Sequence, residues 1–199
     1  MRTIAGLGNP GEEYSETRHN VGFAVVRALA DRWRLSWTNE PAARIAKGRF
    51  DSETVMLVEP QLYMNRSGDA LMQIGVAVEA QDLIVIHDEI DLPRGRIRVK
   101  VDGGSAGHRG VASIAEHYGS DFVRVRVGVG RPAEGGDVVE HVLAPFAEGE
   151  RDEVEATIKV AADAVECILQ AGYEAAMQRF NGRQPESIDQ PSLPTTARD

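Results

Sequence analysis

The chain has 199 residues, of which 42% are hydrophobic and 27% are charged, and its formal net charge at pH 7 is −9. This length and composition suit a single domain with its own hydrophobic core. The one cysteine, Cys167, excludes an internal disulfide, and no apolar run approaches the roughly 18 residues of a membrane span. The N-terminal residues also lack the apolar segment and cleavage site of a signal peptide. We therefore expect a cytoplasmic protein with no membrane attachment.

The negative charge is concentrated in the last third of the chain. Residues 131–199 contain 6 Lys and Arg against 14 Asp and Glu, whereas residues 94–131 contain 8 basic and 3 acidic side chains. A nucleic-acid backbone responds to a local basic patch rather than to the net charge of the whole protein. The acidic balance of the chain therefore does not exclude a polyanionic ligand.

Apolar runs of strand length alternate with helical patterns, which predicts an α/β fold with helices packed on a sheet. We expect strands at residues 2–7, 53–59, 83–87, 96–101 and 122–129, and helices at residues 21–33, 67–78, 111–118 and 150–170, followed by a short helix that ends near Asn181. The run LIVIH at residues 83–87 is continuously apolar, which is typical of a central strand covered on both faces. Residues 1–182 are expected to form one domain, and residues 183–199, with Pro, Ser, Thr and Gln, a disordered tail.

Basic side chains alternate with apolar ones on two of the predicted strands. Arg96, Arg98 and Lys100 lie opposite isoleucine and valine residues, and Arg124 and Arg126 lie opposite valines. Each strand is therefore expected to turn its apolar face to the core and its basic face outward. Such a basic face can bind phosphates without recognising a base sequence.

Four polar segments that contain glycine follow the predicted strands, at residues 8–20, 60–68, 87–95 and 102–110. Ligands of open α/β sheets bind at the carboxyl ends of the strands. We therefore expect the four segments to meet at one edge of the sheet and to form a single site.

His19 and Asp88 are the candidates for acid–base chemistry within these segments. His19 precedes the predicted helix at residues 21–33, where the positive end of the helix disfavours a charged imidazole and suits a general base. Asp88 follows the strand at residues 83–87, where a carboxylate could hold a histidine in one tautomer. From position alone, His19 could equally be a surface histidine and Asp88 a residue that caps its own loop.

Two asparagines and two tyrosines are further candidates in the same segments. Asn9 and Asn65 could bind a carbonyl group or a water molecule, but asparagine also suits a turn. Tyr14 and Tyr63 could stack on a base or a ribose, but aromatic side chains more often simply pack.

Several common kinds of site lack support in the sequence. The segment DGGSAGHRG at residues 102–110 is rich in glycine but lacks the GKS or GKT ending of a nucleoside triphosphate loop. The five histidines show no H-x-x-x-H pair, so we expect no metal site, and His87, Asp88 and Asp91 are the only candidates for a divalent cation. There is no G-x-S-x-G motif, and Cys167 is expected to be a small buried side chain within a helix.

Five long motifs together resemble the bacterial peptidyl-tRNA hydrolase family: GLGNPGEEYSETRHNVG, PQLYMNRSG, HDEIDLPRGRIRVK, GGSAGHRGVASI and FVRVRVGVGRP. They occur in order from about residue 3 to the C-terminal helix. The resemblance implies an esterase that releases the peptide from the 3′ ribose of peptidyl-tRNA, without a metal or cofactor. It also implies a monomer with a twisted, mixed and mostly parallel β-sheet flanked by helices.

The resemblance also implies roles for individual residues. His19 matches the catalytic histidine, Asp88 the aspartate that supports it, and Asn9 the residue that separates peptidyl-tRNA from unblocked aminoacyl-tRNA. Asn65 matches an asparagine that binds substrate near the ester. Tyr14 and Tyr63 match aromatic positions of the cleft, and the basic positions that contact tRNA are Arg98, Lys100 and Arg126.

One position departs from the family pattern. Many members have GHNG where this chain has GHRG, so Arg109 replaces an asparagine that contacts substrate. Arginine cannot accept a hydrogen bond but can bind a phosphate or a peptide carbonyl, and we expect Arg109 to keep a role toward the substrate. A non-catalytic RNA-binding protein and a hydrolase of another nucleotide conjugate stay open as alternatives. The presence of His19, Asp88, Asn9 and Asn65 together favours the enzyme, because RNA binding alone needs no pair of histidine and aspartate.

Overall fold

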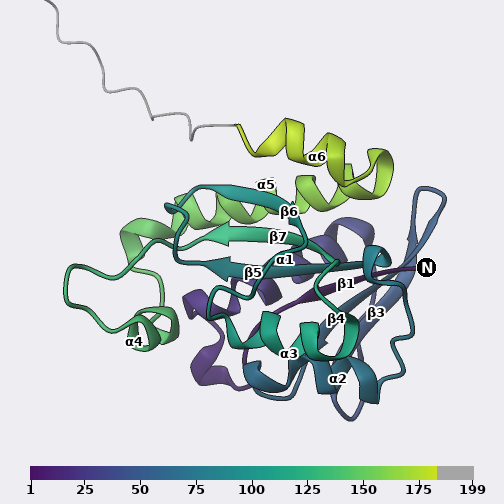
Figure 1. Cartoon of the computed structure of the whole chain (residues 1–199), viewed down its shortest axis with the longest axis horizontal. Helices are drawn as coiled ribbons and strands as arrows, with labels where there is room; N and C mark the ends of the chain where they lie inside the picture. The colour runs from purple at the N-terminus through teal and green to yellow at the C-terminus, as the bar shows by residue number, and fades with distance from the viewer. Residues whose placement is uncertain (183–199) are drawn as a thin grey trace, which may run out of the picture.

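The computed structural model describes residues 1–182, and the predicted tail at residues 183–199 lies outside the described residues. A seven-stranded sheet forms its middle layer, with the strands in the order β2-β3-β4-β1-β5-β7-β6 (Figure 1). The strands are β1 (Arg2–Gly6), β2 (Thr38–Asn39), β3 (Ala43–Phe50), β4 (Glu53–Pro60), β5 (Leu83–Glu89), β6 (Ile97–Val101) and β7 (Val123–Gly128). The central strands β4, β1, β5 and β7 are parallel, and β2, β3 and β6 pair in antiparallel fashion. The predicted mixed, mostly parallel sheet is confirmed.

Helices cover both faces of this sheet. They are α1 (Val21–Trp33), α2 (Ser67–Gln73), α3 (Arg109–Tyr118), α4 (Val138–Leu143), α5 (Arg151–Ala171) and α6 (Tyr173–Phe180). One core cluster joins the sheet to α1, α5 and α6, and a second joins it to α2 and α3 (Figure 1). The short helix α4 packs on neither face, because it lies beyond the end of the sheet toward which the arrows of β5 and β7 point (Figure 1).

Alternation along the strands explains the two cores. Ile4 of β1 belongs to the core under α1 and α5, whereas the next residue, Ala5, belongs to the core under α2 and α3. All seven residues of β5 are buried, as the continuous apolar sequence of a central strand predicts. The strand extends past the predicted end at residue 87, so Asp88 and Glu89 also lie within it.

Four elements differ from the sequence prediction, and one of them, the strand β2, has only two residues and so shows no pattern. The apolar pattern does not predict β3, because exposed Lys47 and Arg49 interrupt it on a strand near the sheet edge. The helix predicted at residues 67–78 ends at Gln73, since Gly75 adopts a left-handed φ of 70° and turns the chain. The six residues of α4 are too few for a helical period to stand out in the sequence.

Cys167 is buried within α5, as expected of a small apolar side chain in the middle of a helix. None of the helices formed by residues 1–182 combines the length and the apolar character that a membrane span requires.

Candidate active site

A cavity of about 350 Å³ opens at the carboxyl ends of the parallel strands. Its walls come from the segments that follow β1 and β4, from the end of β5, from the start of α3 and from α4. The lining residues are Asn9, His19, Tyr63, Met64, Asn65, Asp88, Glu89, Ile90, Ser105, Ala106, Gly107, His108, Arg109, Val138, Val139, Val142 and Leu143. The polar segments after β1, β4 and β5 therefore meet in one site, as the sequence predicts.

The close packing of α1 on the sheet places His19 in this cavity. His19 lies in the single helical turn Arg18–Asn20 that leads into α1. Gly22, in the first turn of α1, approaches the main chain of Leu7 and Ile86 so closely that a Cβ atom would collide with both. Only glycine permits this contact, which presses the start of α1 against the ends of β1 and β5. His19 is thereby brought beside Asp88.

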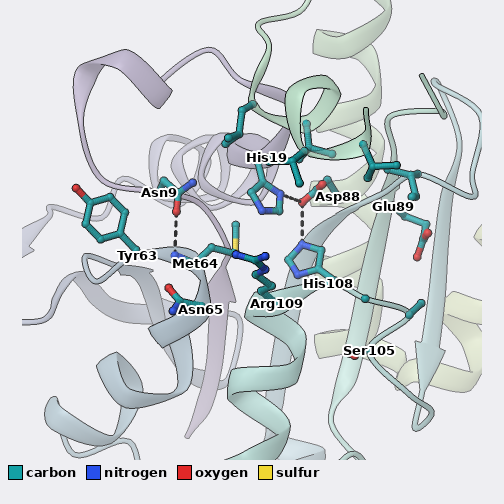
Figure 2. Close-up of a pocket in the computed structure, with 17 residues that line it drawn as sticks. Asn9, His19, Tyr63, Met64, Asn65, Asp88, Glu89, Ser105, His108 and Arg109 are labelled. Carbon is teal, nitrogen blue, oxygen red and sulfur yellow. Dashed lines mark hydrogen bonds and ion pairs between the residues drawn. The ribbon is translucent and has the colours of Figure 1, made fainter. Parts of the chain in front are cut away.

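Asp88 fixes the tautomer of His19. Nδ1 of His19 lies 2.8 Å from Oδ1 of Asp88, which is 4% exposed (Figure 2). Since the ionised carboxylate can only accept a hydrogen bond, Nδ1 carries the proton and Nε2 keeps its lone pair. No group within residues 1–182 hydrogen-bonds to Nε2. In the neutral ring the hydrogen bond to Asp88 leaves the lone pair on Nε2, on the side where a general base would need it.

A second histidine, His108, binds the same oxygen of Asp88. Its Nε2 lies 2.8 Å from Asp88 Oδ1, and its Nδ1 accepts the Val111 main-chain N–H at 3.3 Å. His108 is thus both the N-cap of α3 and a second N–H donor to the carboxylate. Gly110 permits this arrangement, because a side chain there would collide with Met64 and Leu7. The sequence pattern does not single out His108, although it places the segment 102–110 near the site.

The two hydrogen bonds keep the buried Asp88 ionised. Burial by itself raises the pKa of this carboxyl, but His108 and His19, whose N–H groups hydrogen-bond to it, outweigh burial and hold the pKa below its usual value. His87, on the other side of His108, behaves in the opposite way. Burial lowers its pKa to about 3, and the neutral ring donates Nδ1–H to the main-chain oxygen of Asp88 at 2.7 Å.

The same cluster offers the one set of three potential metal-ligand atoms within residues 1–182. These atoms, from His19, Asp88 and His108, lie within 4.8 Å of one another. Because Nδ1 of His108 accepts a hydrogen bond, its Nε2 carries a proton and has no lone pair for a metal. The geometry suits two N–H donors on one carboxylate better than a metal centre. The other candidate group for a cation, His87, Asp88 and Asp91, is not brought together as three ligand atoms within residues 1–182, and Asp91 pairs with Arg131 at 2.8 Å.

Asn9 is oriented by its neighbours. Its Oδ1 accepts the Met64 main-chain N–H at 2.8 Å, which turns Nδ2 toward the cavity as a donor (Figure 2). The main chain of Asn9 exchanges two hydrogen bonds with the side chain of Asn20, at 2.8 and 2.9 Å. Asn20 is buried and follows His19 directly, so it ties the two polar parts of the first segment together. Sequence analysis did not select Asn20, because an asparagine beside a helix start is also a common capping residue.

Three further predicted residues line the cavity. Tyr63 is 59% exposed, so much of its side chain is open to a ligand, and Asn65 lies close to it in the turn Met64–Arg66 that precedes α2. Arg109 is the first residue of α3, and its guanidinium points into the cavity between Met64 and His108 (Figure 2). No carboxylate within residues 1–182 pairs with Arg109.

The chain is similar to known proteins both in sequence and in overall fold. The family model for peptidyl-tRNA hydrolase matches residues 3–188. The chain belongs to the peptidyl-tRNA hydrolase family. A peptidyl-tRNA hydrolase of Rubrobacter xylanophilus is 46% identical over 178 residues, covering 89% of this chain and 99% of the relative. One of Syntrophotalea carbinolica is 44% identical over 189 residues, covering 92% and 98%. The crystal structure of peptidyl-tRNA hydrolase from Acinetobacter baumannii has a TM-score of 0.87 at 35% identity, covering 93% of this chain and 96% of that chain.

Some positions that the family resemblance implies lie outside the cavity. Tyr14 ends the turn Glu12–Tyr14 and is not among the lining residues. Arg98 and Lys100 are exposed on β6, whereas Arg126 on β7 donates Nε and Nη2 to Glu89 at 2.9 and 2.6 Å. Of these three basic positions, two are therefore exposed and one is held in an ion pair.

The segment after β6 reaches the cavity by an unexpected route. Because β6 is antiparallel to β7, its last residue, Val101, pairs with Val123 at the start of β7. The segment after β6 therefore begins at the amino ends of the parallel strands, away from the cavity. The expectation that all four segments begin at the same end of the strands is therefore wrong for the segment at residues 102–110. Arg124, buried rather than facing outward, binds the carbonyls of Gly103 and Gly104, and the chain then returns to the cavity at residues 105–109.

Proposed function

We propose that this chain is a peptidyl-tRNA hydrolase that cleaves the ester between a peptide and the 3′ ribose of tRNA. One observation carries the proposal: a single oxygen of Asp88 accepts N–H groups from His19 and His108 and leaves Nε2 of His19 free in the cavity. RNA binding alone needs no such base, whereas ester hydrolysis by water does.

The residues suggest a direct attack by water. Nε2 of His19 removes a proton from water as its oxygen bonds to the ester carbonyl carbon, and Asp88 stabilises the imidazolium that forms. The Nδ2 group of Asn9 and the amide of Asn65 donate hydrogen bonds to the oxygen that gains negative charge. When the bond to the ribose breaks, Nε2–H of His19 returns the proton to the 3′ oxygen. Water is consumed, and a free peptide and a free tRNA are released.

The other predicted residues would bind the rest of the substrate. The exposed ring of Tyr63 is placed to stack on the terminal base or ribose, and Arg109 to bind a phosphate or a peptide carbonyl. Arg98 and Lys100 would bind tRNA phosphates, with Arg126 weakened by its ion pair. Tyr14 would contact substrate only beyond the cavity.

We also propose that the enzyme acts as a monomer in the cytoplasm. Every side chain of the mechanism comes from one chain, so the site needs no second subunit. The proposed substrate is a product of translation, which takes place in the cytoplasm.

The test compares N-acetylated with unblocked aminoacyl-tRNA as substrates. We expect rapid release of the acyl group from the blocked form alone, and a fall in kcat of about 10²- to 10⁴-fold in His19→Ala. His117→Ala is the matched control, since His117 also donates to a carboxylate, that of Asp69, but lies outside the cavity. Tight binding of tRNA without hydrolysis would support the RNA-binding alternative. Equal cleavage of both substrates would point to a hydrolase of other conjugates.

A further inference from the structure

The residue before His19 holds α4, the helix that forms one wall of the cavity. Arg18 is buried and points away from His19, toward the C-terminal end of α4. Its Nη1 lies 3.4 Å from the carbonyl oxygen of His141, 3.2 Å from that of Ala144 and 2.9 Å from that of Pro145. Its Nη2 donates to Glu150 at 2.9 Å. One guanidinium thus binds three carbonyls at the end of α4 and the carboxylate that balances its charge.

The main chain strengthens this link. The N–H of Arg18 donates to the carbonyl of Ala144 at 3.1 Å, and Thr17 forms an isolated antiparallel bridge with Pro145. The guanidinium also lies over the ring of Phe146, 5.1 Å from its centre. The segment after α4 is therefore attached directly to the residues that precede His19.

The helix that Arg18 holds is short and depends on such contacts. With six residues, α4 is well below the length at which a helix is stable by itself, and the last carbonyls of any helix lack partners within it. The buried Arg18 cation binds one of these carbonyls, that of His141, together with the carbonyls of Ala144 and Pro145 just beyond the helix, and it suits the negative end of the helix. At the other side of α4, His141 contacts the carbonyl of Gly130 at 2.9 Å.

The same helix presents apolar side chains to the cavity. Val138, Val139 and Leu143 are 41%, 55% and 36% exposed, and all three line the cavity with Val142. Exposed apolar side chains gathered at a cavity indicate contact with an apolar part of a ligand. In the proposed substrate, the group beside the ester carbonyl is the side chain of the esterified amino acid. The α4 wall is thus placed to contact that side chain.

We propose that Arg18 is a positioning residue that fixes the α4 wall relative to His19 and so sets the preference of the cavity for an apolar esterified residue. This inference rests on the proposed function. Arg18 acts through the wall and does not touch the reacting atoms. Loss of Arg18 lets α4 move, so kcat/KM falls more for a substrate that packs on the α4 wall than for one that does not.

The experiment compares N-acetyl-leucyl-tRNA with N-acetyl-glycyl-tRNA, below the melting temperature of each variant. In Arg18→Lys, a single ammonium group cannot bind three carbonyls and a carboxylate together. We expect the leucyl-to-glycyl ratio of kcat/KM to fall about tenfold, mainly through KM of the leucyl substrate. Arg94→Lys is the matched control, because Arg94 also pairs with Glu150 but does not contact α4, and its ratio stays at the wild-type value.

A double-mutant cycle with Val139→Ala shows whether Arg18 acts through the wall. The effects of the two substitutions on the leucyl-to-glycyl ratio are expected to be non-additive, because Val139 contributes little to that ratio once α4 has moved. Additive effects, an unchanged ratio, or an equal loss on both substrates would each overturn the inference. If Arg18→Lys does not fold, Glu150→Gln must lower the ratio in the same direction, and an unchanged ratio overturns the inference. Absence of hydrolysis by the wild-type enzyme would instead refute the proposed function.

Discussion

Arg98 and Arg126 lie directly opposite each other on β6 and β7, but they are expected to contribute unequally to tRNA binding. Arg98 is exposed, and no carboxylate within residues 1–182 pairs with it. Arg126 gives two N–H groups to one oxygen of Glu89, which is 6% exposed. A phosphate that binds Arg126 must compete with this buried carboxylate. We therefore predict that Arg98→Ala reduces the salt dependence of tRNA binding more than Arg126→Ala does.

The size of the effect follows from counterion release. Each neutralised phosphate contributes about 0.7 to 0.9 to the slope of log K against log salt concentration. For a fourfold change in salt, a slope difference of about 0.8 corresponds to a factor of about 3. The affinity advantage of the wild-type protein over Arg98→Ala should therefore shrink about threefold between 50 and 200 mM salt. For Arg126→Ala the change should be clearly smaller, and Glu89→Gln should increase the slope, since it frees the charge of Arg126.

Binding is measured with N-acetyl-aminoacyl-tRNA in a His19→Ala background, which prevents cleavage during the titration. Lys47→Ala is a suitable control, because Lys47 is an exposed cation on β3, toward the other edge of the sheet. Thermal melting shows whether each variant, above all Glu89→Gln, keeps its fold. An equal loss of slope in Arg98→Ala and Arg126→Ala, or weaker binding by folded Glu89→Gln, would refute the reasoning.

Three further predictions concern single side chains. The pKa of His87 is about 3 in the folded state and about 6.5 when unfolded, so its contribution to stability is complete above pH 6.5 and is lost as the pH falls toward 3. When urea unfolding is compared at pH 7 and pH 5, His87→Phe should lose about 2 kcal/mol less stability at the lower pH than the wild type does. An unchanged pH dependence would contradict this role of His87. Asn20→Ala removes both hydrogen bonds to the main chain of Asn9 and should cost about 1–3 kcal/mol of stability and lower kcat; retention of both values would count against it. Arg109→Asn should change KM or kcat for peptidyl-tRNA, and unaltered values of both would show that Arg109 has no role toward the substrate.

Local sequence pattern predicts the parts of the fold in which one kind of periodicity dominates. The helix at residues 21–33 and the strand from residue 83 have the expected positions, since a buried stripe or a continuous apolar run specifies them. The strand β3 could not be predicted in this way, because its buried first half gives way to exposed Lys47 and Arg49 and it owes its position to pairing with β4. Such pairing is a tertiary contact that no local window contains.

The same distinction applies to the basic face. The alternation of residues 123–128 predicts which side chains share a face of β7, but it does not show what lies opposite that face. Arg124 is buried there on the carbonyls of the glycine-rich segment, and Arg126 meets Glu89 from β5. Two arginines on the same face of one strand thus differ: Arg124 holds the glycine-rich segment, whereas Arg126 forms an ion pair with Glu89.

The dependence of His19 on distant residues follows from the burial of Asp88. A carboxylate with 4% exposure is costly to ionise, and the bond from His19 is one of two that stabilise its charge. His108 supplies the other, and its ring is fixed because Val111 occupies its second nitrogen. His108 belongs to the segment that begins at the amino ends of the parallel strands. Arg124 holds the start of that segment through the carbonyl of Gly104. The tautomer and orientation of the proposed base are therefore maintained by a chain of contacts that runs from Arg124 through His108 and Asp88 to His19.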